Sequence, residues 1–183
     1  MLSVLCLTLV SSCTPQDMSI ETYKSKKVVI EKSMAKGEVS SAADDSRGIK
    51  WVAPKSWTAQ KTNSIRIGSF KLPNIKNAKG EVSIIALAGD GGGLLANINR
   101  WRGQISLPDQ SLAEVQSELT KIVGKLGNFN YLLIENKNSN KAIAVAFIEY
   151  KGKSIFVKAN GDSSVVKKSI SEFKEFVKGM YEN

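Results

Sequence analysis

The sequence predicts an α+β domain in which helices cover an antiparallel β-sheet. Stretches with strand patterns come in groups between helical stretches, without a regular alternation of strand and helix. The last strands are joined by a short hairpin connection, which suits antiparallel neighbours. Hydrophobic residues make up 42% of the 183, enough for a core, but aromatic residues only 7%, so aliphatic side chains supply most of it.

The first half of the domain contains two predicted strands and a helix. Residues 64–70 follow a strand pattern. Residues 81–88 are apolar at nearly every position, which predicts a strand that is buried on both faces. The glycine-rich residues 89–93 predict a sharp turn, and a helix is predicted over residues 94–104.

A capping box opens the next predicted helix. Ser111 and Glu114 have the spacing at which each side chain caps the backbone N–H of the other. The helix is expected to continue until Gly124 or Gly127 stops it. Its apolar positions share one face and are Leu112, Val115, Leu119, Ile122, Val123 and Leu126.

Three strands and a last helix complete the predicted domain. The strands are expected at residues 131–135, 142–150 and 154–159. Lys151 and Gly152 form a tight hairpin connection between the second and the third, with glycine where a positive φ is wanted. Asp162 or Ser163 then caps the final helix. Its apolar positions recur at helical spacing and are Val166, Ile170, Phe173, Val177 and Met180.

The first twelve residues predict a lipoprotein signal peptide. Residues 1–12 are uncharged and mostly apolar, too short to span a bilayer but as long as the hydrophobic region of a signal peptide. The run ends in Val10-Ser11-Ser12-Cys13, which resembles a bacterial lipobox, so cleavage before Cys13 and lipid on its sulfur and amine are expected. An ordinary N-terminus is the alternative. The usual basic residue before the apolar run is missing, which leaves open whether the true start lies upstream.

Residues 13–49 have the composition of a flexible tether, and residues 50–183 form the predicted domain. The tether is rich in Ser, Lys, Asp and Glu and poor in large apolar residues. The formal net charge of the chain is +9. This charge either keeps the protein soluble or favours an anionic membrane surface or polymer. Nucleic acid is not an expected partner, because export separates the protein from it.

The sequence lacks the residues of the common catalytic and metal centres. It has no histidine, which excludes Ser-His-Asp and Cys-His mechanisms and the usual zinc sites. Cys6 lies in the excised segment and Cys13 is used by lipid, so no free thiol is expected. The glycine run 89–93 lacks the Lys and Ser/Thr of a phosphate-binding loop. We therefore expect no enzyme activity, no metal and no cofactor.

The predicted helix at 94–104 carries the candidate binding patch. Its polar and aromatic members are Asn97, Asn99, Arg100, Trp101, Arg102 and Gln104. On a helix Asn97, Arg100 and Gln104 share one face, and Leu94, Ile98 and Trp101 share another that packs on the sheet. Two interpretations stay open. The polar side chains either satisfy the backbone of nearby loops, or they recognise a carboxylate, phosphate or glycan, with tryptophan as a stacking surface.

Three runs of the sequence resemble the PsbP-like α/β/α sandwich superfamily. They are residues 51–57, residues 91–104, with the Asn-x-Asn-Arg-Trp motif as the most specific part, and residues 155–161. The resemblance covers about 130 residues and extends to secreted bacterial proteins and lipoproteins. It implies an antiparallel sheet flanked by helices. It implies no function, because the site residues of the photosystem II subunit and of the Ran-binding factor in this superfamily have no match here.

Together these features predict a non-catalytic envelope lipoprotein whose domain binds a protein or an anionic envelope component. The membrane is the expected partner through lipid on Cys13. Thr14 rather than Asp follows that cysteine, which resembles outer-membrane sorting, facing the periplasm, if the source is Gram-negative. The alternatives are an accessory or assembly factor of a membrane protein complex and, as the weakest, an enzyme of unrecognised type.

Overall fold

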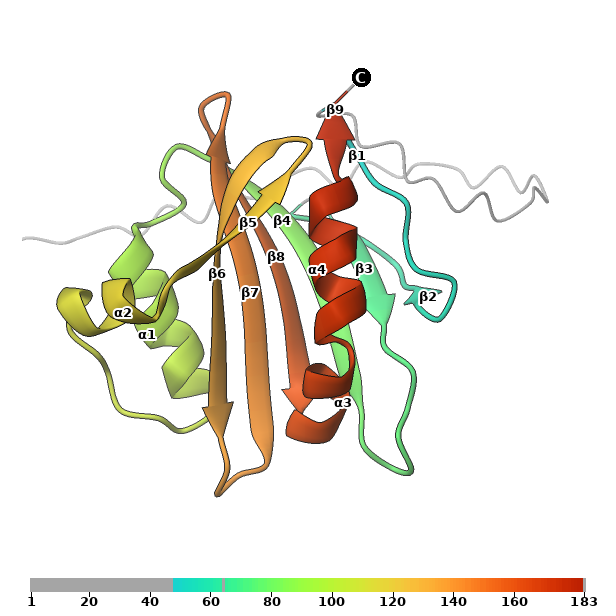
Figure 1. Ribbon diagram of the computed structural model, residues 1–183, viewed down its shortest axis with the longest axis vertical. Coiled ribbons are helices and arrows are strands. Elements are labelled where there is room, and N and C mark those ends of the chain that lie inside the picture. The colour runs from blue at the N-terminus through green and yellow to red at the C-terminus, as the bar shows by residue number, and fades with distance from the viewer. Residues whose placement is uncertain (1–47, 64, 183) are drawn as a thin grey trace, which may run out of the picture. The chain divides into compact units, whose positions relative to one another are not determined.

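Seven strands form one antiparallel sheet in the computed structural model, which describes residues 48–63 and 65–182. The strands are β2 (Thr58–Ala59), β3 (Arg66–Lys71), β4 (Gly80–Ala88), β5 (Thr120–Gly124), β6 (Gly127–Asn136), β7 (Lys141–Tyr150) and β8 (Lys153–Asp162). Their order across the sheet is β2-β3-β4-β8-β7-β6-β5 (Figure 1). The predicted α+β class with an antiparallel sheet is confirmed. The predicted signal peptide, Cys13 and most of the tether lie outside the described residues.

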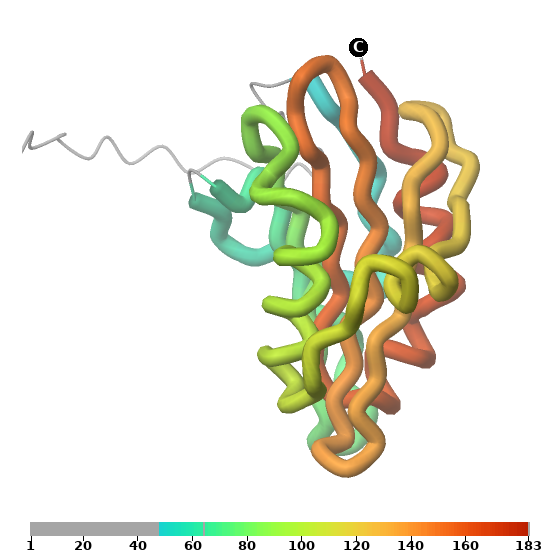
Figure 2. Tube along the Cα trace, turned by 90° about the vertical axis from the view of Figure 1, so that its left-hand side faces the viewer, coloured from blue at the N-terminus to red at the C-terminus, as the bar shows by residue number. Residues whose placement is uncertain are grey.

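Helices cover both faces of the sheet. They are α1 (Leu94–Gln104), α2 (Leu112–Glu118), α3 (Ser163–Lys168) and α4 (Ile170–Gly179). Figure 2 shows the sheet from its edge, with α1 on one side and α4, in red, on the other. None of the helices in residues 48–63 and 65–182 is long and apolar enough to cross a membrane.

Each face of the sheet has its own apolar cluster. Phe129, Phe173 and Met180 belong to the cluster under α3 and α4, where all three are fully buried. Ile98 and Trp101 belong to the cluster under α1 and α2. The central strands face both clusters, so their side chains are buried on either side, as the apolar run at residues 81–88 predicts for β4.

The two ends of the described domain meet in a second, two-stranded sheet. β1 (Ile49–Lys50) pairs with β9 (Tyr181–Glu182) in antiparallel fashion. Ile49, which the sequence assigns to the tether, is only 1% exposed. The regular structure therefore begins one residue before the predicted domain boundary.

The long helix predicted after the capping box is wrong beyond Glu118. The box itself forms at Ser111 and Glu114, but residues 120–124 are strand β5, which pairs with β6. Thr120, Ile122 and Val123 are β-branched and favour a strand. The following Gly124-Lys125-Leu126-Gly127 turns the chain back, because Gly124 and Gly127 face each other in the ladder.

The last predicted helix is two helices with a break at Ser169. Asp162 stands at the N-cap of α3 as predicted, but its side chain makes no bond to the helix. Its carboxylate instead accepts hydrogen bonds from the Lys79 backbone N–H, at 2.6 Å, and from the Lys141 ammonium, at 2.8 Å. Asp162 therefore ties the β3–β4 loop to β7 and β8.

Candidate functional site

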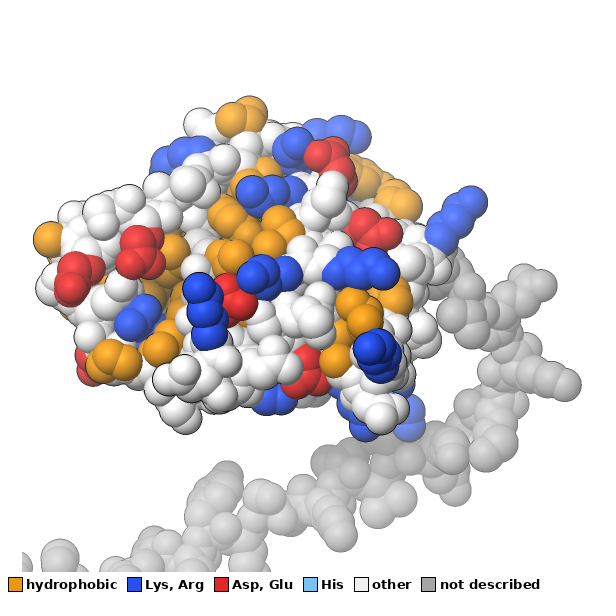
Figure 3. Space-filling view, turned by 60° about the horizontal axis from the view of Figure 1, so that its bottom comes forward, with side chains coloured by type: hydrophobic (Ala, Val, Ile, Leu, Met, Phe, Trp, Pro, Cys, Tyr) orange, Lys and Arg blue, Asp and Glu red, His pale blue; other side chains and the backbone are white. Residues whose placement is uncertain are grey.

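Basic and acidic side chains are interspersed on one face of the domain. On the face shown in Figure 3, lysine and arginine side chains are spread out and acidic side chains lie among them. The net charge of +9 is thus no sign of a binding site on this face. A site has to be recognised from side chains that converge.

The apolar side of α1 belongs to the core. Ile98 is fully buried and Trp101 is 4% exposed. The Trp101 ring meets Phe156 of β8 edge to face, with 5.8 Å between the ring centroids. The indole ring therefore packs inside the protein and offers no surface on which a ligand could stack.

Three of the predicted patch residues hold loops in place. Asn97 is buried and donates to the carbonyls of Gly91 and Gly93, at 2.9 and 2.7 Å. Its amide thus closes the glycine-rich turn onto α1. Asn99 bonds both backbone groups of Gln110, which lies before α2. In the same way, the Arg102 Nε donates to the Pro108 carbonyl at 2.7 Å. These contacts satisfy backbone groups that would otherwise lack a partner.

Arg100 and Gln104 are the patch residues that lie near Lys158 of β8. The Arg100 guanidinium donates to Asn97 Oδ1 at 2.5 Å, which fixes one side of it. The Gln104 Oε1 accepts a hydrogen bond at 3.2 Å from the ammonium of Lys158 on β8. The polar edge of α1 is therefore joined to the sheet at Lys158.

Lys158 is surrounded mainly by positive charge. Burial is the main cause that lowers its pKa, and the charges of Arg66 on β3 and of Arg100 on α1 lower it further. Glu81 is the opposing carboxylate, and it is engaged by Arg66 at 3.2 Å. Lys158 thus lies near two other cations and the Arg66–Glu81 ion pair. We call Arg66, Arg100 and Lys158 the upper basic group.

The floor beside Lys158 is polar and incompletely bonded. Ser83 on β4 lies opposite Lys158 in the ladder, so both side chains are on the same face. Ser83 is 0% exposed, and its hydroxyl has no hydrogen-bond partner among the described residues. The Oδ1 of Asn160, two residues along β8, is also buried without a partner. Buried polar atoms without partners are rare and often mark a place where a ligand or water binds.

A hollow of about 450 Å³ continues this face at the lower end of the sheet. It is lined by Gln60, Lys71, Lys79, Gly80, Glu81, Lys141, Asn160, Gly161 and Asp162. Lys141 pairs with Asp162, but the ammonium groups of Lys71 and Lys79 make no hydrogen bond or ion pair within the described part of the chain. We call Lys71, Lys79 and Lys141 the lower basic group, and both groups together the basic strip.

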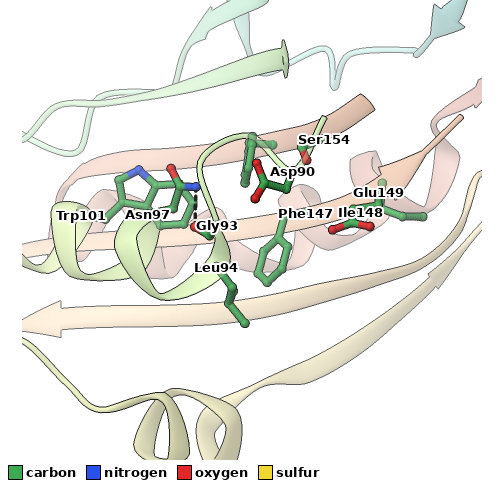
Figure 4. A pocket seen from close by; sticks show the side chains of 10 residues that line it. Asp90, Gly93, Leu94, Asn97, Trp101, Phe147, Ile148, Glu149 and Ser154 are labelled. Atoms are coloured by element: carbon green, nitrogen blue, oxygen red, sulfur yellow. Dashed lines mark hydrogen bonds between the residues drawn. The ribbon is translucent and has the colours of Figure 1, made fainter. Parts of the chain in front are cut away.

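A smaller pocket lies at the other end of α1 (Figure 4). It is lined by Asp90, Gly93, Leu94, Asn97, Trp101, Phe147, Ile148, Glu149, Ser154 and Phe156. Its walls are apolar and its rim carries the carboxylates of Asp90 and Glu149. Its volume of about 40 Å³ admits little more than one water-sized group. Pockets for small-molecule substrates measure about 300–1,000 Å³. We therefore place the candidate site at the basic strip.

Metal-binding residues do not gather in the described structure. In residues 48–63 and 65–182 no three His, Cys, Asp or Glu side chains lie close enough together to hold a metal ion. The only nearby carboxylates of the basic strip, Glu81 and Asp162, are each paired with a cation. The arrangement suits the binding of a negatively charged group.

The comparisons with known proteins concern the fold. No family model and no curated protein matches the chain. Among solved structures it is similar to cyanobacterial PsbP from Synechocystis, at 13% identity and a TM-score of 0.48, over 81% of this chain and 98% of that one. It is also similar to the Ran-binding protein Mog1p of Saccharomyces cerevisiae, at 10% identity and a TM-score of 0.41, over 74% and 90%. A third similar structure, from Bacteroides thetaiotaomicron, has 8% identity and a TM-score of 0.48 over 77% of this chain, which spans about half (47%) of that longer one.

Most of the strip was not predicted from the sequence. Arg100 and Gln104 were, but Arg66, Ser83 and Lys158 come from three different strands. The sequence contains a signal for two of these residues. Lys158 and Ser83 are polar residues inside otherwise apolar strand segments, on the inner strands of the sheet. A polar residue at such a position is an exception that points to a site.

Proposed function

We propose that the protein is a non-catalytic envelope lipoprotein whose domain binds an anionic envelope component at the basic strip. The observation that carries this proposal is the position of Lys158, which is joined to Gln104 of α1 at 3.2 Å and lies near Arg100 of the same helix and near Arg66, the partner of Glu81. An anionic ligand would relieve the mutual repulsion of the three cations. It would also stabilise the charged ammonium group of Lys158, from which burial has removed water.

The chemistry of the side chains supports an oxyanion as ligand. An arginine presents a planar fork that fits carboxylate or phosphate oxygens, and lysine adds a compact point charge. Asn97 and Glu81 hold the two guanidinium groups, so part of the cost of ordering them is already met in the free protein. The partly exposed Asn160 side chain adds a polar group on the same face of the sheet.

The absence of catalysis is part of the proposal and has its own support. The chain contains no histidine, and its acidic residues beside the strip are neutralised by Arg66 and Lys141. The lipobox-like run before Cys13 supports anchoring in a membrane and therefore a place in the cell envelope. A tethered domain with a basic strip is suited to hold an envelope polymer or an anionic surface near that membrane.

A binding titration with anionic probes tests the proposal. The full chain, in detergent micelles, is titrated with polyphosphate and with poly-L-glutamate at fixed ionic strength, since such binding weakens with salt. The double variant Arg100→Gln/Lys158→Met removes two cations from the upper group. Each lost charge-assisted hydrogen bond is worth about 1.5–3 kcal/mol, so we expect the affinity to fall by about tenfold or more.

A matched control separates the site from net charge. The variant Lys55→Gln/Lys168→Gln loses the same charge from two exposed positions away from the strip. We expect its affinity to stay within about threefold of the unchanged chain, because exposed charges are screened. If the unchanged chain binds neither polymer, or if the control loses as much affinity as the test variant, the proposed function is wrong.

A further inference from the structure

We infer that the ligand is a linear polymer with repeated anionic groups, which lies along β8 and contacts the upper and the lower basic group together. This inference rests on the proposed function and adds the size and form of the ligand. It follows from the distance between the two groups, from the residues between them and from the open shape of the lower end.

The cations of the two basic groups are spread too widely for one small anion to contact them all. Lys158 marks the upper group on β8, and Asp162, which binds the Lys141 ammonium and the Lys79 backbone, marks the lower group on the same strand. Four residues of an extended strand span about 13 Å. Lys71 lies nearer to Lys158, because it pairs with Glu81, which pairs with Asn160 in the middle of this stretch. The cations are therefore spread along about 13 Å of β8, so one phosphate or carboxylate group cannot contact all of them, whereas a chain of such groups can.

The face between the groups offers a continuous polar path. Side chains alternate along a strand, so Lys158, Asn160 and Asp162 all project on the same face of β8. Glu81 on β4 lies directly opposite Asn160, and Ser83 lies opposite Lys158. Asn160 thus stands midway between the basic groups, and its buried Oδ1 has no partner in the described structure. Ser83 is fully buried, so a polymer along this path would meet the partly exposed side chains of Lys158, Glu81 and Asn160.

Positive charge exceeds negative charge along the whole path. The strip contains six cationic side chains, and the carboxylates beside it are Glu81 and Asp162. Arg66 neutralises the first and Lys141 the second, at 3.2 and 2.8 Å. Four positive charges remain, and they belong to Lys71, Lys79, Arg100 and Lys158. Because these charges are spread along the path from Lys158 to the lower hollow, a ligand that extends along it gains more than one that binds at a single point.

The lower hollow has the form of a surface that a chain can cross. It is open to solvent and mixes polar and apolar atoms, unlike the enclosed apolar cavities that hold small ligands. Lys71, from β3, and Lys79, from the loop before β4, stand on one side of it, and Lys141 from β7 stands on the other. Cations on both sides of an open hollow suit an extended anion.

A length series tests the inference. The full chain in detergent micelles is titrated with orthophosphate, triphosphate and longer polyphosphates, and in parallel with glutamate, triglutamate and longer oligoglutamates. Two linked contacts raise affinity far more than one, because the second binds at high effective concentration. We expect affinity per molecule to rise by about 100-fold between the shortest chains and chains that span about 13 Å. Phosphate and carboxylate repeats are distinguished by which series binds more tightly.

Variants at the two ends decide which part of the proposal fails. Lys71→Gln/Lys79→Gln leaves the Lys141–Asp162 pair intact, so the fold is expected to stay stable. This variant should bind triphosphate like the unchanged chain but lose about tenfold or more for long polyphosphate, whereas Arg100→Gln/Lys158→Met should lose both. Lys55→Gln/Lys168→Gln again controls for net charge.

The outcomes separate the inference from the proposed function. If affinity does not depend on length, or if the lower variant binds long chains like the control, the polymer is excluded while a small anion at the upper group stays possible. If neither the upper variant nor the lower variant differs from the control, the proposed function falls as well. Tighter binding of a single-stranded oligonucleotide of equal charge would replace the envelope polymer by nucleic acid as the ligand.

Discussion

The position of Lys158 costs stability, a cost that we relate to the proposed binding of anions. Burial and two neighbouring cations lower its pKa, so the protonated ammonium is less stable in the folded chain than in the unfolded chain. This penalty acts against folding wherever the folded chain keeps the group protonated. Residues at binding sites often carry such a penalty, which their ligand removes.

We therefore expect Lys158→Met to stabilise the protein while it weakens the binding of anions. The methionine fills part of the same space without a charge, and the loss of the hydrogen bond to Gln104 offsets some of the gain. The free energy of unfolding should rise by about 0.5–1 kcal/mol at pH 7. Urea unfolding at pH 7 measures it, with the exposed Lys168→Met as control, which should change by less than about 0.5 kcal/mol. A clear loss of stability in Lys158→Met would show that the lysine is structural.

The β1–β9 pair is the element that holds the entry and exit of the domain together. Its hydrogen bonds join Ile49 to the last described residues. Glu182 extends this pair, because its carboxylate accepts hydrogen bonds from the Tyr150 hydroxyl at 2.8 Å and from the Lys151 ammonium at 2.5 Å. The first described residues of the domain are thus held, through Glu182, beside the turn between β7 and β8.

This clamp should make stability depend on pH. The Lys151 ammonium and the Tyr150 hydroxyl lower the pKa of Glu182. A carboxyl group whose pKa is lowered by folding stabilises the fold at pH values above its unfolded pKa, near 4.5. This contribution is lost as the pH falls through the folded pKa. We expect Glu182→Gln to melt at a lower temperature than the unchanged chain at pH 7, and the two to converge toward pH 3. Thermal unfolding followed by circular dichroism measures both.

Glu149→Gln is the matched control for the clamp. Glu149 is exposed in the same hairpin and makes no ion pair within the described residues. Its replacement should leave the melting temperature nearly unchanged at either pH. A constant difference between Glu182→Gln and the unchanged chain from pH 7 to pH 3 would mean that shape, and not charge, matters at this position.

Elements were predicted from the sequence where local patterns decide them. The capping box at Ser111, the helix at 94–104 and the hairpin at Lys151 are all confirmed, because each depends on residues a few positions apart. The helix beyond Glu118 failed, because apolar residues at helical spacing compete there with β-branched residues that pair with β6. β1 and β9 have two residues each and too little pattern to be recognised.

At the scale of the whole molecule, the coverage of the sheet creates the site. The cluster under α1 and α2 draws on β6, β7 and β8, through residues such as Leu132, Val145 and Phe156. No residue of β3 belongs to this cluster, and the basic strip extends from Arg100 on α1, past Lys158 of β8, to β3 and the lower hollow. The sequence predicts Arg100 and Gln104 as candidates, but their partners Arg66 and Lys158 follow only from strand order, which pairs β4 with β8 across more than 60 residues. Non-local pairing of this kind leaves no local signal.

The anchor is the last part of the proposal that can be tested separately. If Cys13 carries lipid, Cys13→Ala should abolish metabolic labelling with palmitate. The protein should also move from the membrane fraction to the soluble fraction, because two or more acyl chains hold a protein on a membrane and the variant has none. Cys6→Ala is the matched control, because this cysteine lies in the segment expected to be excised, and it should keep both label and location.

The Cys13→Ala chain should still bind long polyanions with the affinity of the unchanged chain, because the basic strip consists of domain residues. Retained label in Cys13→Ala, or its loss in Cys6→Ala, would contradict lipidation at Cys13 but leave the strip untouched. A loss of polyanion binding in Cys13→Ala would instead show that the strip needs the membrane to act.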